Sequence, residues 1–290
     1  MALPVLFGAN VDPLWAEAGR PLRLVTQAER DGLDLITVQD HPYQSAHYDT
    51  WTLMSFLAAA TERVTLVPTV ANLPLRPPAM LAKAAASFDV LSGGRLRLGL
   101  GAGAFWEAIE AMGGPRRGKR EAVDALAEAI DVIRAMWSGQ RSARAGGAHY
   151  RVAGVHPGPT PSSALDIWLG SYGPRMLALT GAKAEGWLPS LAYLGLEALA
   201  DATARIDDAA HGAGRDPGHI RKVYNLGGLI TPTKRGDFHG PAGQWIDQII
   251  SLATQRGMNG FVYWPSEDHE RQLALFAHEV VPAARSALSP

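Results

Sequence analysis

The feature that most constrains the fold of this 290-residue chain is a regular alternation of short apolar runs with longer amphipathic segments. The apolar runs predict eight strands, at residues 4–10, 35–40, 64–70, 95–101, 166–171, 186–191, 220–230 and 260–265. Segments with helical periodicity follow them, at residues 20–32, 50–62, 77–92, 121–137, from 174 onward, 197–212, 242–257 and 268–288. Strict alternation with right-handed crossovers gives a parallel sheet. Eight units in a chain of this length predict an α/β fold, a closed (β/α)8 TIM barrel, rather than an open sheet.

The alternation is interrupted once, after the fourth predicted helix. Residues 138–165 are rich in glycine, proline and serine, and residues 149–152 within them predict a small hairpin. No linker or change of composition separates the two halves of the chain. We therefore expect one domain, residues 1–290, with an insertion at about 138–165.

Composition excludes several classes of function. Hydrophobic residues make up 47% of the chain and charged residues 19%, a globular balance, and the net charge of −1 attracts neither nucleic acid nor an acidic membrane. The absence of cysteine excludes disulfides, thiolate nucleophiles and cysteine metal sites. The N-terminal run MALPVLFGANVDP lacks a basic segment, and no apolar run is long enough to cross a membrane. We expect a soluble cytoplasmic protein without nucleic-acid or membrane partners.

Candidate functional residues follow the predicted strands, because the loops at the carboxyl ends of barrel strands form the active face. They are Asn10, Asp40, His41, Val70, Ala71, Asn72, Gly101, Ala102, Gly103, Ser171, Tyr172, Gly173, Pro174, Arg175, Ser190, Asn225, Tyr263 and Trp264.

The fourth predicted strand ends in a glycine-rich run, RLRLGLGAG at Arg95–Gly103. Its glycines leave the carboxyl end of the strand without bulky side chains, so that a flat ligand could approach the backbone. Gly99–Ala104 also fits the dinucleotide pattern G-x-G-x-x-A, which needs an acidic residue at a second strand end about 20 residues later. Residues 121–124 lie at that distance inside a predicted helix. A dinucleotide site is therefore disfavoured, whereas a tight strand-to-loop junction and packing against a planar ligand both remain open.

The run LGSYG at Leu169–Gly173 resembles a nucleophile elbow, but Leu169 replaces the first glycine of that motif. The same geometry suits an anion. Free N–H groups at the start of a helix near Pro174, with Arg175 beside them, predict a phosphate pocket late in the strand order, where such barrels bind phosphate. Ser171 as a simple helix cap is compatible with this prediction.

Asp40-His41-Pro42 closes the second predicted strand and should point His41 into the barrel mouth, where it could exchange a proton near neutral pH. The other histidines are scattered without paired ligand spacing, so no metal site is expected. A basic run, Arg116, Arg117, Lys119 and Arg120, favours a solvated loop, with contact to an anionic cofactor tail as the alternative.

Together these motifs resemble the bacterial luciferase-like superfamily of flavin- and deazaflavin-dependent oxidoreductases. The most specific segment is LPLRPPAMLAKAAASFDVLSGGRLRLGLGAG at 73–103. Supporting segments are GLDLITVQDHP at 32–42, TERVTLVPTV at 61–70 and IWLGSYGPRMLALTGAKAEGWLPS at 167–190. The resemblance implies a barrel with an insertion, a homodimer, and a non-prolyl cis peptide after the third strand, which we expect at Val70–Ala71.

The resemblance also implies how the site works. The bulge after the third strand lies behind the cofactor's central ring, and the segments around Gly101–Gly103 and Tyr172–Arg175 hold the ring edge and the phosphate. The expected cofactor-binding residues are Asp40, Val70, Ala71, Asn72, Gly101, Ala102, Gly103, Ser171, Tyr172, Gly173, Pro174 and Arg175. In deazaflavin-using relatives a strand-end Asp-His pair matches Asp40 and His41, and its histidine donates or accepts a proton.

We therefore predict an oxidoreductase that uses coenzyme F420 and passes hydride between the deazaflavin and a small organic substrate, with His41 handling the proton and Asp40 orienting it. An FMN-dependent monooxygenase of the same superfamily is the first alternative. A non-catalytic cofactor-binding protein is the second, because some relatives carry a glutamate directly after the glycine segment. This chain has Ala104 there and Glu107 three residues later. The sequence does not name the substrate.

Overall fold

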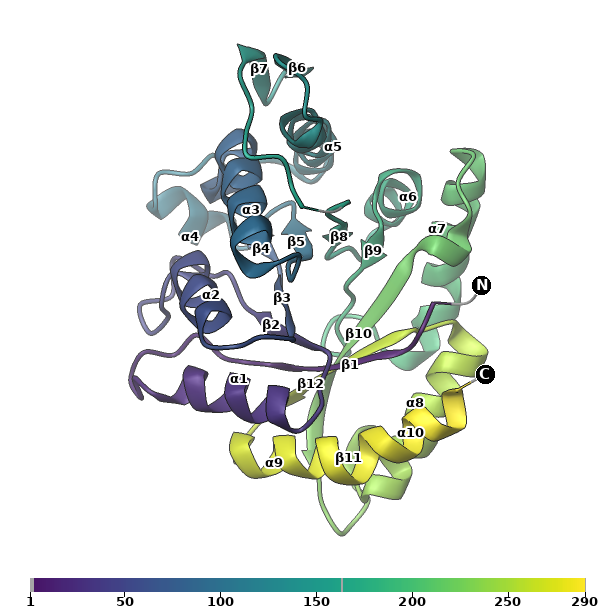
Figure 1. The fold of residues 1–290 in the computed structure, drawn as a ribbon. Helices are drawn as coiled ribbons and strands as arrows, with labels where there is room; N and C mark the ends of the chain where they lie inside the picture. Colours follow the sequence, from purple (N-terminus) through teal and green to yellow (C-terminus); the bar gives the residue numbers. More distant parts are fainter. Residues whose placement is uncertain (1–2, 163, 290) are drawn as a thin grey trace.

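The computed structural model describes residues 3–162 and 164–289 and confirms the predicted (β/α)8 barrel. Parallel strands form a central ring surrounded by helices (Figure 1). The barrel strands are β1 (Leu6–Asn10), β2 (Leu35–Val38), β3 (Thr65–Pro68), β4 (Ala71–Asn72), β5 (Leu98–Gly101), β8 (Ile167–Leu169), β9 (Gly186–Trp187), β10 (Arg221–Ile230) and β12 (Gly260–Pro265). They are ordered β3-β2-β1-β12-β10-β9-β8-β5-β4, and a short strand β11 (His239–Gly240) pairs with β10.

The ring closes between β3 and β5. Leu66 forms a parallel bridge with Leu96, in which the Leu66 N–H donates to the Arg95 carbonyl at 2.9 Å and the Arg97 N–H donates to the Leu66 carbonyl at 3.1 Å. Beyond this bridge the chain shifts, and Ala71 pairs with Leu100. β3 and β4 are thus two halves of one barrel position, the first bonded mainly to β2 and the second to β5.

A non-prolyl cis peptide joins these halves, but at Thr69–Val70 instead of the expected Val70–Ala71. The expectation extended the third strand to Val70. β3 instead ends at Pro68, which lies on the side of the strand that faces β5 and has no N–H to donate there, although the Thr69 N–H still donates to the Val38 carbonyl at the end of β2 at 2.8 Å. The connection therefore begins earlier, and the cis bond lies one residue nearer the N-terminus.

The outer layer consists of the helices α1 (Arg20–Arg30), α2 (Thr50–Ala59), α3 (Pro78–Ser92), α4 (Trp106–Ala111), α5 (Lys119–Trp137), α6 (Pro174–Lys183), α7 (Leu199–Gly212), α8 (Ala242–Arg256), α9 (His269–Leu275) and α10 (Val281–Leu288). The short helix α4 was not predicted. The last helix was predicted as one piece, whereas a π-helical turn at Phe276–Val280 separates α9 from α10. Pro282 explains the wider turn, because its ring cannot fit the regular helical hydrogen-bond ladder. No helix of the described residues is long and apolar enough to cross a membrane.

The predicted hairpin exists, with longer arms than expected. β6 (Ala143–Gly146) and β7 (Arg151–Val155) pair antiparallel and project beside α5, outside the ring (Figure 1). The Glu128 carboxylate of α5 fixes their turn by accepting the N–H groups of Ala148, His149 and Tyr150 at 2.9, 2.7 and 3.0 Å. The assignment of the chain to a single domain with this insertion stays a prediction.

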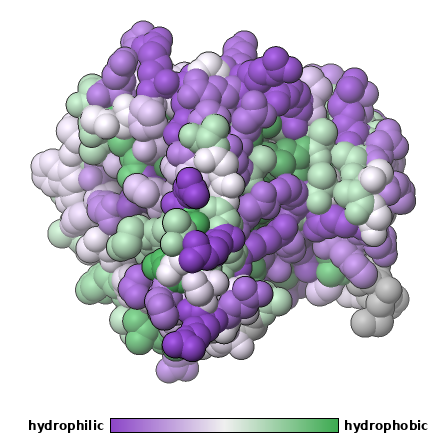
Figure 2. Space-filling view, turned by 90° about the horizontal axis from the view of Figure 1, so that it is seen from above, coloured by the Kyte–Doolittle hydropathy of each residue, from purple (hydrophilic) through white to green (hydrophobic). Residues whose placement is uncertain are grey.

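The interior of the barrel is filled below the strand ends. One buried cluster collects side chains from around the ring: Leu35, Val67, Trp168, Leu188, Val223 and Val262. Val70 and Trp264 pack on this cluster and are only partly buried. They form the floor of a cavity at the carboxyl ends of the strands. The outer face in Figure 2 is a mosaic in which hydrophilic side chains surround smaller hydrophobic areas.

Candidate cofactor and substrate site

A cavity of about 680 Å³ opens at the carboxyl ends of the strands, on the face that the sequence predicts. It is lined by most of the predicted site residues: Asp40, His41, Val70, Ala71, Asn72, Gly101, Ala102, Gly103, Ser171, Tyr172 and Gly173, together with Ser190, Asn225 and Trp264. Pro174 and Arg175 are not among the lining residues. Asn10 and Tyr263 are also absent, because their side chains bond to Thr37 and Gln272 inside the protein.

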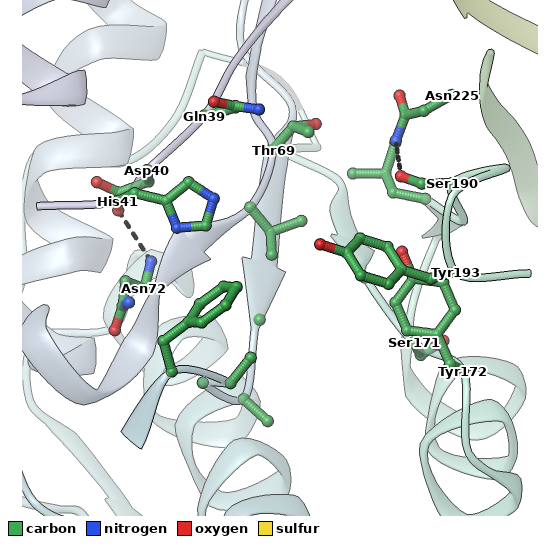
Figure 3. A pocket seen from close by; sticks show the side chains of 18 of the residues that line it. Gln39, Asp40, His41, Thr69, Asn72, Ser171, Tyr172, Ser190, Tyr193 and Asn225 are labelled. Atoms are coloured by element: carbon green, nitrogen blue, oxygen red, sulfur yellow. Dashed lines mark hydrogen bonds between the residues drawn. The ribbon is translucent and has the colours of Figure 1, made fainter. Parts of the chain in front are cut away.

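Asp40 makes no hydrogen bond to His41 in the described part of the chain. Its fully buried carboxylate accepts the Nε and Nη2 groups of Arg76 at 2.6 and 2.7 Å, and the backbone N–H of Asn72 at 2.9 Å (Figure 3). These bonds occupy both carboxylate oxygens and fix the start of β4 against the end of β2. Truncating one partner of such a buried pair typically costs about 3–5 kcal/mol, because the other charge is left unpaired. Asp40 is therefore a positioning residue for the backbone.

His41 is held by Tyr43 instead. Its Nδ1 lies 2.7 Å from the Tyr43 hydroxyl. The imidazole also lies against Phe105, edge to face with ring centroids 5.6 Å apart, and 6.4 Å from the ring of His47. Among the described residues, no protein group bonds Nε2, and the residue lines the cavity. Burial, assisted by His47 and opposed by Asp40, lowers the pKa of His41 below 6.5, so the ring is neutral at pH 7.

The opposite wall carries neutral polar and aromatic groups (Figure 3). Asn225 donates from Nδ2 to the Ser190 hydroxyl at 3.0 Å and accepts from the Trp264 indole at 3.2 Å. Ser171 is buried, and its hydroxyl bonds to Thr180 at 2.8 Å. It is neither an exposed nucleophile nor the cap of α6, a position that Gly173 takes.

The glycine-rich strand end forms the tight junction that was one of the two interpretations left open by the sequence. A Cβ on Gly99 would lie 1.9 Å from the Pro68 carbonyl oxygen, and one on Gly101 would lie 2.5 Å from the Val70 side chain. Gly170 on the neighbouring strand also faces Val70, at 3.2 Å. These glycines make room for the β3–β4 connection, and Gly101 and Gly170 also line the cavity. The Val70 side chain lines the cavity beside them.

The cation beside the cavity is also different from the predicted one. Arg175 lies half-exposed on the surface, where its Nη2 bonds to Asp124 of α5 at 2.7 Å. Lys119, the first residue of α5, lines the cavity, and no ion pair engages it within the described residues. The sequence signal was present in the basic run, for which a solvated loop was favoured and contact with an anionic cofactor tail was the alternative. Glu107, the possible second acid, is exposed on α4 and is not part of the lining.

Comparison with known proteins places the chain in a family. A family model described as "Luciferase-like monooxygenase" matches residues 6–234. The chain belongs to this family. A phthiodiolone/phenolphthiodiolone dimycocerosates ketoreductase of Mycobacterium bovis is 30% identical over 76% of the chain and 56% of that relative. A putative coenzyme F420-dependent oxidoreductase of Mycobacterium tuberculosis is 33% identical over 57% of the chain and 49% of its own length. The chain thus spans about half the length of these curated relatives.

Solved structures share the fold of this luciferase-like chain at low sequence identity. An F420-dependent secondary alcohol dehydrogenase in complex with an F420-acetone adduct superposes with a TM-score of 0.86, 18% identity, and coverage of 97% of this chain and 99% of that one. A coenzyme F420-dependent tetrahydromethanopterin reductase from Methanopyrus kandleri superposes with a TM-score of 0.82 and 20% identity, and the match covers 97% of this chain and 99% of that one. A long-chain alkane monooxygenase superposes with a TM-score of 0.80 and 16% identity, and the match covers 99% of this chain and 92% of that one. These likenesses establish the barrel.

The lining of this luciferase-like site fits a planar, hydrogen-bonding cofactor. The Thr69 hydroxyl and the Asn72 side-chain oxygen are buried and have no hydrogen-bond partner in the described part of the chain. Both residues line the cavity. An unpaired buried polar group costs about 1–3 kcal/mol, so these two favour a ligand with complementary polar edges. The Val70 side chain beside them offers an apolar surface, and the cavity volume is in the range of small-molecule sites.

Proposed function

We propose that this chain is an F420-dependent oxidoreductase that moves hydride between the deazaflavin and the carbon of a secondary alcohol or ketone. The observation that carries the proposal is His41, a neutral imidazole that lines the cavity, bonds to Tyr43 through Nδ1 and keeps Nε2 free of protein partners. The names of an F420-dependent relative, a ketoreductase relative and an F420-dependent alcohol dehydrogenase of the same fold support the cofactor and the substrate class.

The cofactor, when bound, accepts or supplies the hydride. Thr69 and Asn72 would hold its polar ring edge, and Val70 would support its apolar face. Lys119 and the N–H groups at the start of α6, after Gly173, would hold its phosphate. Arg76 and Asp40 keep this wall rigid by fixing the Asn72 backbone.

The proton belongs to His41. In alcohol oxidation the hydroxyl proton passes to Nε2 as the hydride leaves the adjacent carbon, and the product is a ketone and an imidazolium. The Tyr43 hydroxyl accepts a hydrogen bond from the Nδ1–H of that imidazolium. In ketone reduction Nε2 returns the proton to the carbonyl oxygen.

A cofactor titration tests this proposal. We expect F420 to bind to the purified protein with a change in its fluorescence, and FMN to bind far more weakly. Tight FMN binding without a response to F420 would instead support the FMN-dependent monooxygenase. The name of the family model and the shared fold of a long-chain alkane monooxygenase are the reasons for testing this alternative.

The non-catalytic alternative is tested by His41→Ala. We expect this variant to bind F420 normally and to lose about 10²- to 10⁴-fold in turnover, the usual contribution of a general acid–base. His219→Ala, on an exposed turn, is the matched control. A wild-type protein that binds F420 but turns over neither alcohols nor ketones would favour the binding protein.

We also propose that the chain acts as a homodimer through the outer faces of α2 and α3, which lie side by side (Figure 1). α2 contains no charged residue, and the charged residues of α3 are Lys83, which bonds to the Gly158 carbonyl, and the buried Asp89. Large apolar side chains remain exposed there: Phe56, Met80, Val90 and Leu91. Exposed apolar side chains gathered on two neighbouring helices are typical of a surface that a partner covers, and a second copy would cover these.

A further inference from the structure

The mouth of the cavity is built from aromatic side chains. Tyr43 and Phe105 stand on the His41 side, with ring centroids 5.9 Å apart. Tyr172 and Tyr193 stand on the opposite side, 5.5 Å apart, and face His41 across the opening (Figure 3). All four residues line the cavity, and we call them the aromatic mouth.

Much of this aromatic surface is exposed. Phe105 is 52% exposed and Tyr193 70% exposed. Covering such a side chain with an apolar partner typically yields about a 10- to 100-fold gain in affinity. The two rings lie on opposite sides of the opening, so that a ligand leaving the cavity would pass between them.

The charges of the cavity disfavour an anionic body in this passage. Asp40 is saturated by Arg76 and the Asn72 N–H, and His41 is neutral at pH 7. Lys119 is the remaining charged residue of the lining, and the proposed function commits it to the cofactor phosphate. An anionic substrate group among the four rings would lose hydration without gaining a partner.

We propose that the substrates are uncharged secondary alcohols or ketones with an extended apolar body, which lies between Phe105 and Tyr193 while the reacting carbon lies at His41. The alcohol or ketone group of these substrates rests on the proposed function, and their apolar body is inferred from the aromatic mouth. We assign Phe105 and Tyr193 as residues that determine substrate specificity.

The test compares alkan-2-ols of increasing length, from propan-2-ol through hexan-2-ol and nonan-2-ol to dodecan-2-ol, with the F420-loaded enzyme. We expect kcat/KM to rise about three- to fourfold for each methylene that becomes buried, and then to level off. Phe105→Ala and Tyr193→Ala should each reduce kcat/KM for dodecan-2-ol about 10- to 100-fold more than they reduce kcat/KM for propan-2-ol. Phe105→Leu should restore most of the preference. Met112 is an equally exposed apolar residue outside the cavity, so Met112→Ala should leave kcat/KM unchanged for both alcohols.

A second measurement separates this inference from the proposed function. Calorimetric titration of the cofactor-free protein with propan-2-one, nonan-2-one and dodecan-2-one reports affinity without turnover. Affinity that grows with chain length and falls in Phe105→Ala supports the aromatic mouth even if no alcohol is oxidised. Turnover of propan-2-ol with no dependence on chain length overturns the inference and leaves the proposed function standing. The inference is also overturned if Phe105→Ala lowers kcat/KM equally for short and long alcohols. The same holds if the variant changes the oligomeric state and leaves the preference for long alcohols unchanged.

Discussion

The pairing of His41 with a tyrosine defines the chemistry of the site at the scale of single residues. A carboxylate partner would stabilise the protonated imidazole and raise its pKa, whereas the Tyr43 hydroxyl is neutral. Burial, followed by the nearby negative charge of Asp40 and by the Tyr193 hydroxyl, raises the pKa of Tyr43 to about 12, so the hydroxyl keeps its proton at pH 7. The pair therefore presents a base that is neutral and ready to accept a proton from an alcohol.

Tyr43→Phe tests this pairing. We expect kcat for alcohol oxidation to fall about tenfold, because the imidazolium loses its hydrogen-bond acceptor, while KM and F420 affinity stay within about twofold. The pKa of His41 is already lowered, and losing the acceptor lowers it further. The acidic limb of the kcat profile should therefore move to lower pH.

Tyr48→Phe is the matched control, since Tyr48 packs against the core and does not line the cavity. It should leave both kcat and the acidic limb unchanged. An unshifted limb and undiminished kcat in Tyr43→Phe would show that Tyr43 does not position His41.

The residues of this site could be predicted from the sequence only where local order decides their position. Asp40 and His41 are adjacent at a strand end, and both line the cavity as expected. Their bonding partners depend on contacts between distant segments. Asp40 pairs with Arg76, which lies 36 positions away in the sequence. Likewise Arg175 is taken by Asp124, 51 positions away, and Lys119 lines the cavity instead. Charge and spacing alone do not reveal which cationic side chain forms an ion pair in the folded chain.

At the scale of secondary-structure elements, the β3–β4 connection depends on Gly99. Gly99→Ala would place a Cβ 1.9 Å from the Pro68 backbone oxygen, so that β3 or β5 must shift. We expect a loss of about 1–3 kcal/mol or more in the free energy of unfolding, measured with urea. Gly243→Ala, in the first turn of α8 with no atom within 4 Å of the new Cβ, should instead be neutral or stabilising by up to about 1 kcal/mol. Equal stabilities of the two variants would contradict this account of the glycine run.

The elements themselves were largely predictable, because the period of apolar residues is a local property of the chain. The predicted bounds of β12 match the structure, and the inward residues of the last helix, including Leu273 and Phe276, are buried as expected. Errors arise where a proline acts within an apolar run. Pro68 ends β3 early and Pro282 divides the last helix, although the surrounding hydrophobic pattern continues through both.

At the scale of the whole molecule, ring closure brings together residues from both ends of the chain. β1 pairs with β12 and with β2, so the first and last strands are neighbours. The walls of the cavity are consequently set by separate segments, with His41 and Asn72 on one side and Ser190 and Asn225 on the other (Figure 3). Closure satisfies the strand edges and leaves the outer helices as the surfaces through which the barrel can associate.

The proposed homodimer is tested by a charge on its central apolar side chain. We expect the wild-type protein to sediment at about twice 30.9 kDa. Phe56→Glu should sediment at the mass of one chain, because a carboxylate buried against apolar helices raises the dimer dissociation constant at least about 100-fold. Met112→Glu, at a similarly exposed apolar position directly after α4, should remain dimeric. A dimeric Phe56→Glu protein would place the interface on another face, and a monomeric wild type at micromolar concentration would leave the apolar surface of α2 and α3 without the proposed partner.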